Sequence, residues 1–185
     1  MKNKLDPKVR DLLEVIGIFA IVVAIYYALF AFVLSNDTVS GPSMQPNFET
    51  GDRVIAVRHS SLHRGDIVVL NAPDSPGALY IKRVIGVPGD TIRFKNDQLY
   101  INGKKTKEPY LDKGKKLYSM GNLYTENFTL QSKNLGKKVP ANSYFVMGDH
   151  RNVSKDSRIF GYVKRSAIVG KVKLRYWPLN KITWY

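Results

Sequence analysis

The chain divides into one long apolar block near its start and a longer remainder in which short apolar runs alternate with polar turns. The block is VIGIFAIVVAIYYALFAFVL, residues 15–34, and its 20 positions include no charged residue. A helix of this length rises about 30 Å, the thickness of the hydrocarbon core of a bilayer. A buried core helix would show a polar face, and a cleavable signal peptide would have a shorter apolar region and a small-residue cleavage site. The block therefore predicts a transmembrane helix.

Basic residues are placed asymmetrically around this block. Four precede it, and the next one along the chain is Arg53. The four are Lys2, Lys4, Lys8 and Arg10. Because positive charge flanking a membrane span stays in the cytoplasm, we expect residues 1–14 to be cytoplasmic. Residues 35–185 would then form the extracytoplasmic domain of a single-pass protein of the cell membrane.

Beyond the block, the chain contains short runs rich in β-branched and aromatic residues, bounded by Gly, Pro, Asn and Asp. Such runs are typical of β-strands. We expect strands at residues 53–57, 66–70, 80–87, 91–94, 99–102, 143–148 and 168–178. Residues 91–102 have the pattern of a hairpin with its turn near Lys95-Asn96-Asp97. No helix is expected in residues 35–185. The sequence therefore predicts a mainly β fold, with one transmembrane helix followed by an antiparallel β domain.

Residues 104–138 differ from the rest of this domain. They are rich in Lys, Asn and Gly and weakly periodic, so we expect a mobile basic insertion. From Ser35 onward the chain has 25 Lys and Arg against 12 Asp and Glu. Such an excess suits an anionic surface, which could be nucleic acid, acidic lipid head groups or an acidic cell-wall polymer. The absence of a nucleic-acid-binding motif favours the membrane or wall surface.

The residue types that build metal sites and disulfides are scarce. There is no Cys, which excludes disulfides and thiolate metal sites. His59 and His63 lie in a polar stretch, RHSSLHRGD, without a neighbouring Glu, so no metal site is expected. His150 lies in a turn-like GDHR segment. A Ser-His-Asp set stays open, although no serine occupies a GxSxG elbow.

Ser43 lies soon after the apolar block, in the segment SGPSMQP. Pro42 and Pro46 bracket it and stiffen the local backbone, and the apolar Met44 is its neighbour. On composition alone, a serine between prolines is a turn residue. It becomes a candidate nucleophile only if a base lies within hydrogen-bond reach.

Lys82 is a candidate for that base. It lies in LYIKRVIGVPGD beside Arg83. Because side chains alternate faces along a strand, one of these adjacent cations should face an interior or a cleft. A lysine that loses its hydration has a lowered pKa and can act as a base, whereas one on a solvated edge stays charged.

The third polar segment is GDHRNVSKDSRIFG, residues 148–161. Its charges alternate in sign, which predicts a loop held in shape by salt bridges. These charged residues are Asp149, Arg151, Asp156 and Arg158. Such a loop could equally be purely structural.

Four segments, taken in order, resemble the conserved boxes of bacterial type I signal peptidases, particularly the short single-anchor forms of Gram-positive bacteria. They are SGPSMQP, GDIVVLN, YIKRVIGVPGDTI and GDHRNVSKDSRIFG. The apolar block and DQLYINGKK…EPYL share the resemblance, which covers nearly the whole chain except parts of 104–138. It implies the β fold that signal peptidases share with self-cleaving repressor peptidases.

The resemblance implies a role for each matching residue. Ser43 would attack the scissile carbonyl, and Lys82 would accept its proton and later pass it to the leaving amine. Ser154 would orient the Lys82 amine through a hydrogen bond. Some family members use a serine hydroxyl in the oxyanion hole where this chain has Gly41, so a backbone N–H at Gly41 would serve beside the N–H of Ser43.

Other matching residues would support the site without reacting. Met44 would line the pocket for a small P1 side chain, and His150 stands where the family commonly has Asn, which makes a pH-sensitive loop conceivable. Four residues would brace the site. They are Arg83, Asp149, Asp156 and Arg158.

The implied substrates are secreted preproteins, cut after a small-x-small motif, typically Ala-x-Ala, at the outer membrane surface. The implied partners are these preproteins, the lipid bilayer and the protein-export machinery, with no cofactor and no nucleic acid. Two alternatives stay open: a soluble self-cleaving repressor peptidase, against which the apolar block argues, and a catalytically silent membrane-tethered β domain that binds wall polymer or a secretion partner. The presence of both Ser43 and Lys82 argues against the silent domain.

Overall fold

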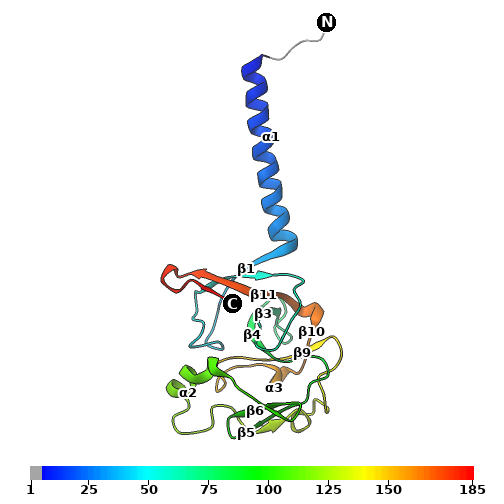
Figure 1. The fold of residues 1–185 in the computed structure, drawn as a ribbon, viewed down its shortest axis with the longest axis vertical. Coiled ribbons are helices and arrows are strands. Elements are labelled where there is room, and N and C mark those ends of the chain that lie inside the picture. Colours follow the sequence, from blue (N-terminus) through cyan, green and yellow to red (C-terminus); the bar gives the residue numbers. More distant parts are fainter. Residues whose placement is uncertain (1–5) are drawn as a thin grey trace.

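The computed structural model describes residues 6–185, and it consists of a long helix standing on a β domain (Figure 1). Helix α1 runs Pro7–Ala28 and continues as a π-helical turn, Leu29–Val33. The Asp6 side chain caps its start by accepting from the Lys8 N–H. The helix is therefore longer at its N-terminal end than the predicted span of residues 15–34. It is long and apolar enough to cross a membrane, and none of its residues is buried.

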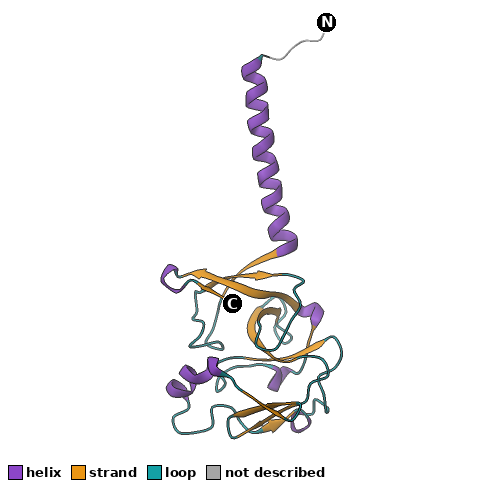
Figure 2. Cartoon of the chain, in the orientation of Figure 1, coloured by secondary structure: helices purple, strands orange, loops and turns teal. Residues whose placement is uncertain are grey.

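The β domain contains two antiparallel sheets (Figure 2). In the larger sheet the strand order is β1-β2-β11-β3-β4-β9-β10, and β12 pairs with β11. These strands are β1 Leu34–Thr38, β2 Arg53–Val57, β3 Ile67–Asn71, β4 Leu79–Gly86, β9 Ser143–Met147, β10 Val163–Lys164, β11 Ile168–Trp177 and β12 Thr183–Trp184. The fold class predicted from the sequence is confirmed.

The smaller sheet lies at the end of the domain opposite α1 (Figure 1). Its strand order is β7-β6-β5-β8. The strands are β5 Ile92–Lys95, β6 Gln98–Ile101, β7 Lys104–Thr106 and β8 Phe128–Thr129. The predicted hairpin is present, since β5 and β6 pair from Ile92 with Ile101 to Lys95 with Gln98. Asn96 and Asp97 form its turn with φ of 50° and 59°, as a tight two-residue hairpin turn requires.

Two short helices of the β domain were not predicted. They are α2, Asp112–Tyr118, and α3, Ser157–Phe160. Helices of one or two turns are too short to show a hydrophobic period, so the sequence carries no pattern for them. Four 3₁₀ turns complete the part of the chain that the structure describes. They are η2 Pro109–Leu111, η3 Gln131–Lys133, η4 Arg165–Ala167 and η5 Leu179–Lys181.

Residues 104–138, expected as a mobile insertion, are packed into the domain. They supply β7, β8 and α2, and four of their large side chains are buried. The four are Leu111, Tyr124, Phe128 and Leu130. The Tyr124 hydroxyl also donates to the Asp149 carbonyl over 2.8 Å. The segment is therefore built into the fold, because widely spaced apolar residues anchor it without creating a visible period.

Three apolar clusters form the core. One fills the space between the smaller sheet and the start of β9 and includes Phe94 and Phe145. The second lies under β1, β2 and the chain between them and includes Met44 and Phe48. The third packs on the opposite side of β3 and β4 and includes Val84. Strand β4 contributes to all three clusters, so a polar side chain on it is enclosed.

Candidate active site

Ser43 and Lys82 lie next to each other. Lys82 Nζ donates a hydrogen bond to Ser43 Oγ over 2.8 Å and another to the carbonyl of Ile81 over 3.0 Å. The serine and the lysine are 39 residues apart in the chain, so the fold brings them together. An amine in direct contact with a hydroxyl can take its proton once the amine is neutral.

The protein surrounds the Lys82 side chain almost completely. Lys82 is 3% exposed on β4, which lies between β3 and β9 in the larger sheet. Because burial removes the water that stabilises an ammonium ion, it lowers the pKa of Lys82 from 10.5 to about 8. The carboxylates of Asp156, Asp74 and Asp149 act in the opposite direction. Around pH 8 a large share of Lys82 is therefore neutral and able to accept a proton.

The turn that carries Ser43 is fixed from two sides. The neighbouring side chains of Met44 and Phe48 are fully buried, and the Phe48 N–H donates to the Met44 carbonyl over 3.0 Å. From the loop after β9, the N–H of His150 donates to the Ser43 carbonyl, also over 3.0 Å. These contacts hold the serine backbone at a set position relative to β4.

Gly41 has a backbone conformation that favours glycine, with φ of +84°. Its N–H donates to Thr50 Oγ1 over 3.1 Å, so the N–H that the family resemblance assigns to an oxyanion hole is engaged in this structure. The Ser43 N–H makes no hydrogen bond to other parts of residues 6–185. Of the two candidate donors, only the Ser43 N–H is without a partner within residues 6–185.

Arg83, the neighbour of Lys82 on β4, forms a buried ion pair with Asp149. Its Nε and Nη2 donate to the two carboxylate oxygens over 2.8 and 2.6 Å. Asn47 Nδ2 donates to the same carboxylate over 2.7 Å. This network joins β4, the nucleophile turn and the loop after β9. The sequence named no partner for Arg83, and the structure pairs it with Asp149.

Asp156 pairs with Arg158 within the same loop. The Arg158 Nε and Nη2 each donate to the carboxylate over 2.8 Å. The Gly148 N–H also donates to Asp156, over 3.0 Å, and Asp156 caps helix α3. Because Asp156 is fully buried, these donors replace the water it loses. The pair fixes the loop that runs past the serine and the lysine.

Sequence reasoning missed the partner of Arg151, another cation of the loop after β9. Arg151 Nη2 lies 2.5 Å from Glu108 Oε1, and both side chains are buried. Tyr110 donates to the same Glu108 oxygen over 2.7 Å. The alternating charges of the loop suggested pairs within it, but Arg151 pairs with residues 104–138 instead. A contact between positions 43 residues apart leaves no local signal in the sequence.

Ser154 is buried nearby, but it does not contact Lys82 in the way the family resemblance implies. Its Oγ has no hydrogen-bond partner among residues 6–185. Gly148 lies against it, since a Cβ added at Gly148 would collide with Ser154 Oγ and with the Ser43 carbonyl. Only glycine at position 148 allows the loop to approach the serine this closely.

The three histidines do not form a catalytic set with a serine. His59 and His63 are exposed, and no hydrogen bond within residues 6–185 joins a histidine ring to a serine hydroxyl. His150 is buried and stacks on Tyr118, with ring centroids 4.0 Å apart. Its burial lowers the pKa of His150, while the polar backbone of Pro42 acts in the opposite direction.

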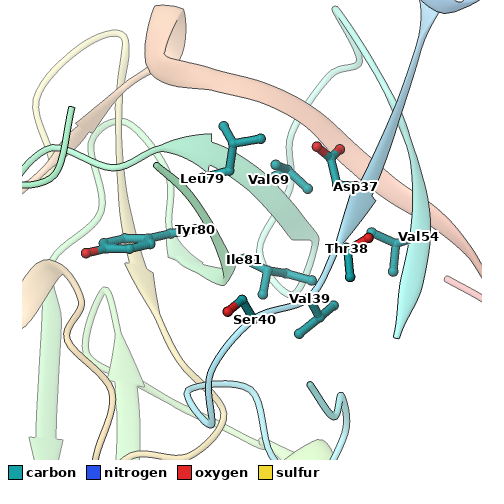
Figure 3. Close-up of a pocket in the computed structure, with 9 residues that line it drawn as sticks. All are labelled: Asp37, Thr38, Val39, Ser40, Val54, Val69, Leu79, Tyr80 and Ile81. Carbon is teal, nitrogen blue, oxygen red and sulfur yellow. The ribbon is translucent and has the colours of Figure 1, made fainter. Parts of the chain in front are cut away.

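A pocket of about 70 Å³ lies between the end of β1 and the start of β4 (Figure 3). Residues Leu79–Ile81 border it on one side and Asp37–Ser40 on the other. The β4 residues up to Lys82 pair only with β3, because pairing with β9 begins at Arg83. Strand β1 pairs only with β2. Two strand edges without a partner therefore border the same pocket.

Met44 does not reach the surface of this pocket. It is fully buried in the second core cluster, where it packs with Val39, a residue that does line the pocket. Val54 and Val69 also line it, and the polar residues Asp37, Thr38, Ser40 and Tyr80 complete a wall that is partly apolar and partly polar. Met44 therefore shapes the pocket from behind. Within residues 6–185 no group of three His, Cys, Asp or Glu side chains could hold a metal ion.

Comparison with known proteins identifies the family of the chain. The family model described as "Signal peptidase, peptidase S26" matches residues 12–177. A signal peptidase IB of Staphylococcus aureus is 39% identical over 183 residues, covering 95% of this chain and 94% of the relative. A signal peptidase I of Bacillus caldolyticus is 44% identical over 168 residues, covering 89% and 91%.

A solved structure agrees with these relatives. The crystal structure of a signal peptidase I from Enterococcus faecalis is 39% identical, with a TM-score of 0.57, and the match covers 60% of this chain and 97% of that one. An N-terminal apolar helix joined to this β fold defines a class of membrane-anchored serine peptidases. The chain belongs to the signal peptidase family, peptidase S26, as the sequence motifs predicted.

Proposed function

We propose that the chain is a type I signal peptidase that cuts secreted preproteins with Ser43 as nucleophile and Lys82 as general base. The observation that carries this proposal is the 2.8 Å hydrogen bond between Ser43 Oγ and a lysine amine that is almost fully buried. The lowered pKa of Lys82, about 8, makes the neutral amine available near neutral pH. Family membership supports the same assignment.

The reaction follows from the position of the amine. Ser43 Oγ attacks the scissile carbonyl while its proton passes to neutral Lys82 Nζ. When the tetrahedral intermediate collapses, Nζ returns that proton to the leaving amine and an acyl-enzyme remains on Ser43. A water molecule then attacks the ester, gives its proton to Nζ, and Ser43 regains a proton from Nζ as it leaves. The lysine ends each cycle neutral.

The developing oxyanion needs hydrogen-bond donors. The Ser43 N–H is a candidate because it donates no hydrogen bond within residues 6–185. Gly41 would contribute its N–H once this group leaves the Thr50 hydroxyl, which it contacts over 3.1 Å. Loss of a single oxyanion donor costs about 3 kcal/mol of transition-state stabilisation in serine peptidases. We infer that substrate binding displaces Thr50.

The pocket in Figure 3 is the proposed substrate cleft. An extended peptide lying between Asp37–Ser40 and Leu79–Ile81 would meet an unpaired strand edge on each side and gain main-chain hydrogen bonds from both. Its small volume of about 70 Å³ suits small side chains, in keeping with a small-x-small motif such as Ala-x-Ala. Main-chain recognition would let many different preproteins bind.

A location at the outer membrane surface has support from the C-terminal hairpin. Strands β11 and β12 lie at the end of the domain that carries α1 (Figure 1). Large apolar side chains there are exposed, including Trp177 and Trp184. Tryptophan favours the interface between lipid and water. With residues 1–14 in the cytoplasm, this hairpin would rest on the outer leaflet, and preproteins delivered by the export machinery would emerge beside Ser43.

The experiment is cleavage of a preprotein with an Ala-x-Ala site by the full chain in detergent. We expect Ser43→Ala and Lys82→Ala each to lower the rate by about three orders of magnitude or more, with the fold retained. Ser61→Ala and Lys164→Ala, at exposed positions, are the matched controls and should cut at the wild-type rate. Full activity of Ser43→Ala would refute the proposal, and an inactive wild-type chain would favour the silent-domain alternative.

A further inference from the structure

The smaller sheet has one face on the core and one face open. Burial alternates along β5 and β6, so that Phe94 and Leu99 point inward. Arg93 is exposed and Tyr100 half-buried on the opposite face. This open face lies at the end of the domain opposite α1 (Figure 1). It is therefore remote from the membrane and from the proposed substrate cleft.

A row of polar side chains crosses this face. The strand registers pair Lys105 with Tyr100, Tyr100 with Arg93, and Arg93 with Thr129. Neighbouring strands are about 4.8 Å apart, so the row spans about 14 Å. The Arg93 guanidinium lies over the Tyr100 ring, 4.6 Å from its centroid, which holds the cation in place.

A groove of about 320 Å³ opens on the same face. Arg93 and Tyr100 line it, together with Lys137 from the chain after η3. Thr91, Thr129 and Gln131 also line it and supply hydroxyl and amide groups. We call Arg93, Tyr100, Thr129 and Lys137, together with Lys105, which pairs with Tyr100 beside the groove, the distal basic groove. It combines fixed positive charge with neutral hydrogen-bonding groups.

The positive charge of this groove is not neutralised by the protein. Within residues 6–185 no ion pair involves Arg93, Lys105 or Lys137, and the nearby carboxylates are engaged elsewhere. Glu126 pairs with Lys133 over 2.8 Å. Asp97 accepts from the N–H groups of Tyr124 and Thr125 over 2.9 and 2.6 Å. An anionic ligand would thus meet these cations without competition.

The surroundings of the groove indicate what kind of anion it suits. The two large apolar residues that line the groove, Ile92 and Leu130, are buried, so a protein partner would find little apolar surface in it to anchor on. Tyr100 is the groove's only aromatic residue, and Arg93 already covers its ring, which leaves no free platform for a nucleic-acid base. Its distance from α1 excludes the head groups of the anchoring bilayer. A flexible chain of phosphates and polyols matches the remaining features.

We propose that the distal basic groove binds a polyol-phosphate polymer. Phosphates contact Arg93, Lys105 and Lys137, and polyol hydroxyls bond to Thr129 and its polar neighbours. Binding at the end opposite the anchor is independent of peptide cleavage and links the domain to an anionic polymer outside the membrane. This ligand would account for the charge excess of residues 104–138, since Lys105 and Lys137 of that segment belong to the groove.

The test is binding of labelled poly(glycerol phosphate) to the full chain in neutral detergent, measured by fluorescence anisotropy from roughly 50 to 200 mM salt. The variant Arg93→Gln with Lys137→Gln removes two cations from the groove. The matched control, Lys113→Gln with Lys116→Gln, removes two exposed cations from α2. Neutral dextran and polyglutamate serve as comparison polymers, and preprotein cleavage is measured in parallel.

We expect the groove variant to bind at least about tenfold more weakly and its salt slope to fall by about 1.4, the value for two lost contacts to a single-stranded polyanion. The control should bind like the wild type, and both variants should cut preprotein at the wild-type rate. Equal weakening of both variants would mean general charge attraction and overturn the site. If polyglutamate binds as tightly as the polyol phosphate, the groove is a site for acidic proteins and the proposal is overturned.

Discussion

The imidazole of His150 stacks on the ring of Tyr118, with centroids 4.0 Å apart and ring planes 22° apart. Tyr118 ends helix α2 in the segment 104–138, and the His150 N–H donates to the Ser43 carbonyl. His150 therefore connects this segment to the backbone of the candidate nucleophile, with its ring on Tyr118 and its N–H on Ser43. The segment supports the site as well as carrying charge.

Removing the stack should weaken this support. We expect Tyr118→Ala to lower the free energy of unfolding by about 0.5–1.5 kcal/mol beyond the loss of buried area. Preprotein cleavage should fall a few-fold because the Ser43 backbone loses part of its restraint. Urea denaturation and cleavage rates measure both effects. Leu117→Ala, an exposed neighbour on the same helix, is the control, and an equal effect there would contradict a specific role for the stack.

His150 should make the domain less stable in mild acid. Burial lowers the pKa of His150 below 6.5, so the unfolded chain takes up a proton more readily than the folded one. Above pH 6.5 both states are neutral; below it, the free energy of unfolding falls as the pH falls. Urea denaturation at pH 8 and pH 5.5 should show a smaller difference between these pH values for His150→Asn than for the wild type. Identical pH dependence in both proteins would contradict this.

The pH dependence of cleavage should report the protonation of Lys82. With a pKa of about 8, the neutral fraction of Lys82 falls about tenfold per pH unit below that value. We expect kcat/KM to level off above pH 8 and to be about a hundredfold lower at pH 6. His150→Asn should retain this acidic limb. A rate that rises only near pH 10.5 would show that Lys82 keeps its ordinary pKa.

The buried pair between Arg83 and Asp149 should contribute far more to stability than an exposed pair. Asp149→Asn leaves Arg83 without a counter-charge, and breaking a buried pair this way costs about 3–5 kcal/mol. Glu126→Gln breaks the more exposed pair with Lys133 and should cost less than about 1 kcal/mol. Urea denaturation gives both values. Similar losses for the two variants would mean that Arg83 finds other partners.

Ser154 should affect cleavage without supporting the fold. Its buried Oγ has no partner, so Ser154→Ala should leave stability unchanged or raise it by about 1 kcal/mol. We expect cleavage to fall about tenfold, because a free hydroxyl is available to orient the Lys82 amine once Ser43 gives up its proton. Wild-type activity in this variant would rule out the orienting role. A loss of stability would show that the hydroxyl is already bonded.

The main strands could be predicted because their patterns are local. The predicted strand at 53–57 coincides with β2, and the turn residues Asn96 and Asp97 marked the hairpin. Strand β1 was missed because LSNDT is polar, and it forms a strand only by pairing with β2. Its conformation is decided by tertiary contacts, which no short window of sequence contains.

The candidate site could be predicted only in part. Alternation along β4 indicated that Lys82 or Arg83 would face inward, but both are buried because clusters cover each side of the strand. The Ser43 and Lys82 pair itself was inferred from family motifs. The partners Asp149 for Arg83 and Glu108 for Arg151 depend on how distant loops meet, which spacing along the chain does not encode.

The junction between α1 and β1 contains no spacer. Helical turn Leu29–Val33 runs directly into a strand that starts at Leu34. Arg58 secures this point, its N–H donating to the Val33 carbonyl over 2.8 Å and its Nε to the Leu34 carbonyl over 3.0 Å. The domain is therefore joined to its anchor without a linker. In the proposed orientation the nucleophile is held at one height above the lipid. The distance of a peptide bond from the membrane surface would then help to decide which bond of an emerging preprotein is cut.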